Sequence, residues 1–165
     1  MELKYRHEYK FALSVSDYFI VRSRLLAALR HDPHAGTTGE YGIRSVYFDN
    51  LEDKALREKL KEQCILTVPR VAKKQVSARD GTIKYLMKTQ QLRPKTVVDY
   101  LREPFVFPPG NVRITLDREL HTAPFQPDLL EKPLAMLPAG NGVLLEVKYD
   151  EFLPEVIRDL VQLGN

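Results

Sequence analysis

The sequence has little of what marks secreted, zinc-binding or membrane-spanning proteins. Cys64 is the single cysteine, which excludes an internal disulfide and a zinc site made of cysteines alone, so a reducing compartment fits. No apolar run approaches the about 18 residues of a membrane span, and the first ten residues are too charged for a signal peptide. We therefore expect a cytoplasmic protein with no membrane span of its own.

An excess of positive charge is also lacking. The 165 residues contain 25 Lys and Arg against 22 Asp and Glu, which gives a formal net charge of +3. A protein that coats nucleic acid through bulk charge would be more basic, so we expect no nucleic-acid partner. Any anion site must come from local clustering of cations. The length suits one domain with a proper core.

The common enzyme motifs are missing as well. The sequence has no phosphate-cradling glycine loop, no HExxH zinc motif and no GxSxG nucleophile motif. What remains is a set of cations and carboxylates at alternating positions of predicted strands.

Three segments alternate charged and apolar residues with the period of two that predicts a β-strand. They span residues 3–13, 112–117 and 143–149, and in each of them one face carries a mixture of basic and acidic side chains. The charged positions on these faces include Glu8, Lys10, Arg113, Asp117, Glu146 and Lys148.

Two further segments have strand composition. Residues 41–49 are rich in aromatic and β-branched side chains, and Arg44 lies among apolar neighbours, where an Arg is costly unless it is paired. Residues 95–107 place Tyr100 and Arg102 on one side, and the Pro-Pro-Gly turn that follows predicts a hairpin with the strand beginning at residue 112.

Helical spacing of Tyr18, Val21, Leu25 and Leu29 predicts a helix that begins at an N-cap Ser16 and ends before Pro33. The other helices are predicted, from composition, at 51–60, as two short helices within 61–91, and at 150–163 with Pro154 in its first turn. A proline-rich loop is expected over 121–142. Three aromatic side chains are expected in the core: Tyr9, Tyr47 and Phe48.

The charged faces have two interpretations. An antiparallel sheet commonly packs one face on the core and exposes the other to water. The alternative is a closed or nearly closed antiparallel β-tunnel, an α+β fold with helices packed outside and cations and carboxylates inside. Such an interior suits phosphate chemistry, because Arg and Lys neutralise phosphoryl oxygens while a nearby carboxylate holds Mg²⁺ or Mn²⁺.

Five segments of the sequence resemble the VTC domain, the polyphosphate polymerase domain of the vacuolar transporter chaperone family, in its free-standing bacterial form. They follow one another in the family's order and cover most of the chain outside its middle. They are RHEYKF (6–11), IRSVYFDN (43–50), LRPKTVVDYLREPFV (92–106), NVRITLD (111–117) and LLEVKYDEFLPEVIRDLVQLGN (144–165).

The resemblance implies a member of the triphosphate tunnel metalloenzyme (CYTH-like) superfamily that transfers the γ-phosphate of ATP or another nucleoside triphosphate to polyphosphate with Mn²⁺ or Mg²⁺. Lys10, Arg44, Arg102 and Arg113 would contact phosphates, and Tyr100 would support the same site. Glu146 would hold the metal. Glu8 is the second choice for a metal ligand and Lys148 for a phosphate contact.

The sequence also departs from the family's pattern. We expect a single domain over residues 1–165 that lacks central tunnel strands after Leu60, with their Arg-x-Arg pair and Glu-Lys-Lys run, and a carboxyl-terminal extension with a Ser-Lys-Tyr motif. Either the protein is naturally shortened or the sequence is a fragment of a longer one. Unpaired strand edges would then invite pairing with another chain, so a homodimer and a membrane-protein partner both remain open.

Three functions are consistent with these observations. The first is a polyphosphate polymerase-like enzyme, which the segment at 92–106 favours. The second is a module that binds polyphosphate or a nucleotide without turnover, which the missing strands favour. The third is a related tunnel enzyme that hydrolyses triphosphate or makes a cyclic nucleotide.

Overall fold

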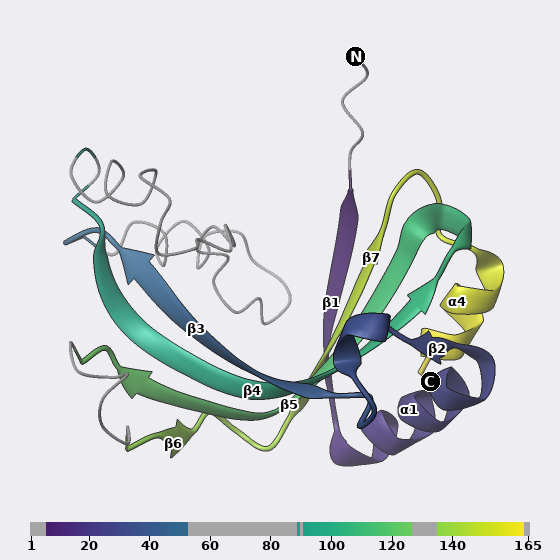
Figure 1. The fold of residues 1–165 in the computed structure, drawn as a ribbon, viewed down its shortest axis with the longest axis horizontal. Helices are drawn as coiled ribbons and strands as arrows, with labels where there is room; N and C mark the ends of the chain where they lie inside the picture. The colour runs from purple at the N-terminus through teal and green to yellow at the C-terminus, as the bar shows by residue number, and fades with distance from the viewer. Residues whose placement is uncertain (1–5, 53–88, 90, 127–134, 164–165) are drawn as a thin grey trace. The chain divides into compact units, whose positions relative to one another are not determined.

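The computed structural model describes residues 6–52, 89, 91–126 and 135–163 (Figure 1). Within these residues the fold is α+β, with helices α1 (Val15–Ala28) and α4 (Glu155–Val161) and one sheet. The strands are β1 (His7–Leu13), β2 (Arg30–His31), β3 (Tyr41–Asp49), β4 (Arg93–Phe107), β5 (Val112–Pro124), β6 (Leu137–Pro138) and β7 (Val143–Tyr149). Two short 3₁₀ turns are η1 (Pro33–Ala35) and η2 (Pro109–Asn111).

The sheet is antiparallel and open. Its strand order is β1-β7-β5-β4-β2, with β3 also pairing with β4 and β6 with β5. β7 pairs antiparallel with β1 on one side and with β5 on the other. In the part of the chain that the structure describes, the order ends at β1 and at β2, which confirms the predicted α+β class with an incomplete tunnel or barrel.

The chain divides into two compact units. The first comprises residues 1–43, 99–121 and 138–165, and the second comprises 44–98 and 122–137. Both described helices, β1 and β7 belong to the first unit. The single domain expected over residues 1–165 stays a prediction.

The hydrophobic core of the first unit lies between its helices and one face of its strands (Figure 1). α1 contributes Tyr18, Val21 and Leu25, as its spacing predicts, and α4 contributes Ile157. The sheet contributes alternate residues of its strands, among them Phe105, Ile114, Leu116, Leu145 and Val147. The helices therefore cover the apolar face, and the side chains at the intervening positions point to the opposite face.

α1 differs from the predicted helix at both ends. Its N-cap is Ser14 rather than Ser16, because the Ser14 hydroxyl accepts a hydrogen bond from the Asp17 backbone N–H at 3.1 Å. The helix ends at Ala28, and Arg30 and His31 then pair with Val106 and Phe105 of β4 as the short strand β2. The backbone groups of Arg30 and His31 therefore pair with β4 instead of continuing the helix.

The predicted hairpin is confirmed, since β4 and β5 are neighbours in the sheet and η2 connects them. β5 continues to Pro124, so the proline-rich segment begins later than predicted, and it includes the strand β6. α4 is shorter than predicted, with Pro154 as its N-cap. Residues 51 and 52 form a turn, and the remainder of the predicted helix 51–60 and nearly all of 61–91 lie outside the described residues.

One predicted core residue is not buried. Tyr9 is 49% exposed, because it lies on a strand at the edge of the sheet, and Tyr47 and Phe48 are half-buried. None of the helices in the described ranges is long and apolar enough to cross a membrane.

Candidate functional site: a charged face in the first unit

Charged side chains from four strands lie on the sheet face opposite the helices, and we call this set the charged cluster. All of its members belong to the first compact unit. The members are Glu8 and Lys10 of β1, Arg102 of β4, Arg113 and Asp117 of β5, and Glu146 and Lys148 of β7.

The register of the strands explains why these residues share a face. Lys10 lies opposite Glu146, and Glu8 lies opposite Lys148. Arg113 lies opposite Lys148 on the other side of β7. Because opposite residues of an antiparallel pair point to the same face, the alternation seen in the sequence becomes a continuous charged surface.

β1 and β7 are joined by a network of ion pairs. Lys10 Nζ lies 2.9 Å from Glu8 Oε1 and 3.1 Å from Glu146 Oε2, and Lys148 donates a hydrogen bond to Glu146 Oε1. The side chains of Glu8, Lys10 and Glu146 are each less than a tenth exposed. Solvent therefore screens these charges little, and a change in one of them acts strongly on the others.

Arg102 and Asp117 form a buried bidentate pair between β4 and β5. Arg102 Nε and Nη2 donate to the two oxygens of Asp117, each at 2.6 Å. The guanidinium carbon lies 5.3 Å from the centre of the Tyr100 ring, which adds a cation–π contact. Burial alone would lower the pKa of Arg102, but the hydrogen bonds to Asp117 and its negative charge outweigh this and raise the pKa above its ordinary value. The fork is thus a permanent cation.

Arg113 occupies a more open position of the charged cluster, with a side chain 35% exposed. Its Nη2 lies 3.1 Å from Asp32 Oδ2 and donates to the Tyr41 hydroxyl at 3.2 Å. Asp32 caps the turn η1 by accepting from the His34 backbone N–H, so this carboxylate is itself fixed. The guanidinium is therefore oriented from the loop that follows α1.

The surroundings of Lys148 act against its positive charge. Burial lowers the pKa of Lys148 below its ordinary value, and although its hydrogen bond to Glu146 and the charge of Glu146 oppose this, the charges of Arg102 and Lys10 lower the pKa further. An anion that neutralised part of this positive charge would raise the pKa of Lys148 again.

The hydroxyl of Thr115 has no hydrogen-bond partner among the described residues, although the residue is only 2% exposed. Thr115 lies opposite Glu146 on the charged face. A buried hydroxyl without a partner costs free energy, so this position is one where a ligand oxygen or a water would be stabilising.

Each cation of the charged cluster is balanced by a carboxylate. Lys10 and Lys148 contact Glu8 and Glu146, and Arg102 contacts Asp117. A phosphate group must therefore compete with these carboxylates unless something else neutralises them.

A divalent cation would do so. In the described residues no three His, Cys, Asp or Glu side chains are grouped to hold a metal by themselves. Glu8 and Glu146 nevertheless converge on one cation, Lys10 Nζ, and Thr115 lies opposite Glu146 in the neighbouring strand. Mg²⁺ sites commonly consist of one or two carboxylates completed by waters and substrate phosphates, so these residues fit such an ion.

All but one of the residues that the sequence predicts for the site belong to the first compact unit. The exception is Arg44, which is exposed on β3 and belongs to the second compact unit. Three residues of this region were given no role in the site from the sequence: Asp117, Thr115 and Asp32. The first two alternate with Arg113 in the sequence, so their period of two carried the signal, whereas nothing local connects Asp32 with Arg113.

The family model described as "VTC domain" matches the chain in two segments, residues 5–71 and 67–165, which together cover every strand and helix described above. A comparison of the sequence with curated proteins finds no match.

Proposed function

The chain belongs to the VTC domain family, and we propose that it binds nucleoside triphosphate and polyphosphate on the charged cluster and transfers a nucleotide γ-phosphate to the polymer. VTC domains belong to the CYTH-like tunnel superfamily, so a function of the polyphosphate polymerase or tunnel-fold type is the coarse expectation. The transfer reaction, its metal and its residues are the proposal.

The observation that carries the proposal is the row of cations from four adjacent strands. Lys10, Arg102, Arg113 and Lys148 come from β1, β4, β5 and β7 and share one face of one compact unit. A single phosphate would need one or two of them, whereas a row of cations matches the repeating charge of a linear polyanion.

Each side chain has a physical role in this proposal. Arg102 presents a planar fork, fixed by Tyr100 and Asp117, that matches two phosphoryl oxygens. Lys10 and Lys148 supply compact charges beside it. Glu8 and Glu146 would hold Mn²⁺ or Mg²⁺, and the ion would supply positive charge that stabilises the phosphoryl oxygens.

The ion pairs of the ligand-free protein suggest how binding proceeds. Lys10 and Lys148 pair with Glu8 and Glu146 in the protein without ligand, so both ammonium groups would be available to phosphate if these carboxylates held a divalent ion. Phosphoryl transfer needs positioning and charge stabilisation rather than a covalent nucleophile, so a rigid strand surface of this kind suffices. Arg44 stays a candidate for a further phosphate contact.

The test is to incubate the full chain with ATP and Mn²⁺ and to measure long-chain polyphosphate, released phosphate and bound nucleotide in parallel. Arg102→Ala and Glu146→Ala should abolish polymer formation, while Arg30→Ala, which removes an exposed Arg of β2, should leave it unchanged. Each lost charged hydrogen bond should weaken triphosphate binding by about 1.5–3 kcal/mol. Unchanged binding and turnover in both site variants would show that the site is assigned wrongly.

A second candidate function is binding without turnover. The open order of the sheet in the described residues favours it, because strands that would enclose the polymer are not among them. Bound nucleotide with neither product would support this candidate. Released phosphate without polymer would instead support a hydrolase of the tunnel type.

A further inference from the structure

β1 forms one end of the strand order. Among the described residues it pairs with β7, residue by residue from His7 opposite Tyr149 to Leu13 opposite Val143, and with no other strand. A strand of seven residues at the end of a sheet presents a row of backbone groups that can pair with another strand.

Proteins commonly protect such edges with inward-pointing charges. β1 carries two in its middle, Glu8 and Lys10, and they are of opposite sign and two residues apart. This spacing selects one antiparallel register with a second copy of β1. A two-fold axis through Tyr9 places Glu8 of each copy opposite Lys10 of the other, whereas an axis through residue 8 or residue 10 places like charges together.

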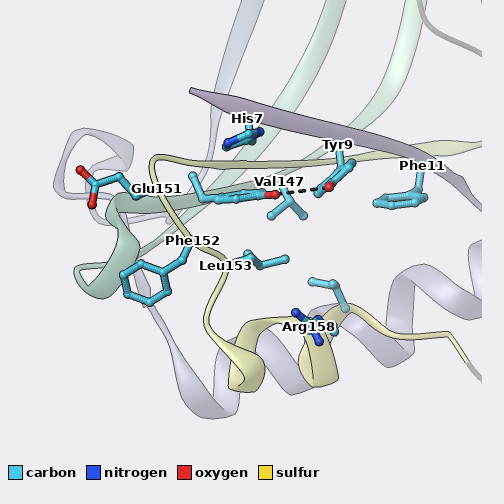
Figure 2. Close-up of a pocket in the computed structure, with 10 residues that line it drawn as sticks. His7, Tyr9, Phe11, Val147, Glu151, Phe152, Leu153 and Arg158 are labelled. Carbon is cyan, nitrogen blue, oxygen red and sulfur yellow. Dashed lines mark hydrogen bonds between the residues drawn. The ribbon is translucent and has the colours of Figure 1, made fainter. Parts of the chain in front are cut away.

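The other face of β1 matches the same register. Tyr9 is 49% exposed and Phe11 is 40% exposed, and both lie with His7 along a groove of about 480 Å³ that Tyr149, Phe152 and Arg158 also line (Figure 2). An axis through Tyr9 places the two copies of Tyr9 opposite each other and His7 opposite Phe11. Aromatic pairs across antiparallel strands stabilise a sheet, and these would remove exposed apolar area from water.

We propose that this chain forms a symmetric dimer in which β1 pairs antiparallel with β1 of a second copy about a two-fold axis at Tyr9. The sheet would then run through both copies, with the Glu8 and Lys10 pairs on one face and the aromatic pairs on the other. This proposal goes beyond the proposed function and does not depend on it.

Sedimentation velocity on the full chain tests the association. The wild type should sediment as a species of twice the 19.0 kDa chain mass over a range of micromolar concentrations. Tyr9→Lys places two ammonium groups opposite each other at the axis and should give a monomer. The matched control is Phe19→Lys, because Phe19 is a 61% exposed aromatic on α1, away from the edge, and this variant should remain a dimer. A wild-type monomer throughout would overturn the proposal.

Cysteine cross-linking tests the register. In a Cys64→Ser background with oxidised glutathione as oxidant, Tyr9→Cys should form a disulfide with itself across the axis, since opposite Cα atoms of antiparallel strands lie about 4.5–5.5 Å apart and disulfides need about 4.4–6.8 Å. Phe11→Cys alone should not cross-link, but an equal mixture with His7→Cys should give a heterodimer. Cross-linking of Phe11→Cys with itself, or none in the mixture, would contradict this register even if Tyr9→Cys failed to fold.

Discussion

Asp117 is expected to stabilise the fold and to oppose ligand binding, and Asp117→Ala separates the two effects. Asp117 and Arg102 are about a tenth exposed or less, and two 2.6 Å hydrogen bonds join them. Removing one partner of a buried pair leaves an uncompensated charge and costs about 3–5 kcal/mol. For a protein of this length each kcal/mol corresponds to about 2–4 °C, so the Tm should fall by roughly 6–20 °C.

The same substitution should strengthen the binding of tripolyphosphate, because the guanidinium of Arg102 no longer has to break its hydrogen bonds to Asp117 before it binds a phosphate. Isothermal titration calorimetry below the Tm of the variant measures this. The control is the double variant Arg102→Met with Asp117→Ala, which should regain most of the lost stability in urea unfolding but bind tripolyphosphate more weakly than the wild type. Additive stability losses together with unchanged affinity in Asp117→Ala would refute the reasoning.

Three further predictions follow from the charges of the first unit. Because the pKa of Lys148 is lowered in the folded protein, this side chain binds fewer protons in the folded than in the unfolded state between that pKa and its ordinary value, so stability should rise with pH in this window. Binding of tripolyphosphate in the same window should take up protons, which calorimetry in two buffers of different ionisation enthalpy measures. Lys148→Met should abolish this uptake. Glu146→Gln should weaken Mn²⁺ binding, followed by electron paramagnetic resonance, roughly tenfold or more, which corresponds to about 1.4 kcal/mol, whereas the exposed Glu155→Gln should not. Glu103→Ala should lower the free energy of unfolding by about 1–3 kcal/mol, because Glu103 is 3% exposed and accepts hydrogen bonds from Arg22 of α1. It should leave the affinity for tripolyphosphate unchanged, because Glu103 lies on the helix side of β4.

The strands and their charged face could be predicted because a period of two fixes which residues share a face. The shared face of Lys10, Glu146 and Lys148 follows from this period together with the pairing of β1 and β7. The helix α1 followed equally from the spacing of its buried residues. The roles of these side chains in phosphate chemistry stay predictions.

What could not be predicted depends on register and on small energy differences. The partner of Arg102 follows from how the turn η2 aligns β4 with β5, and the sequence does not give that alignment. Ser14 and Ser16 are both good N-caps, and the strand β2 that follows α1 is only two residues long, too short to carry a period. Arg113 meets Asp32 only because the loop after α1 returns to the sheet.

Arg102 and Glu103 are neighbours in β4, yet they have opposite charges and serve opposite faces. A slip of β4 by one residue would deliver the guanidinium to the hydrophobic side beneath α1 and the carboxylate to the side of Asp117 and Glu146, where it would meet like charge. Every slip of β4 by an odd number of residues would place these two ions in the wrong surroundings, each costing several kcal/mol. Adjacent residues of opposite sign therefore disfavour every odd-numbered shift of the strand that carries the guanidinium fork.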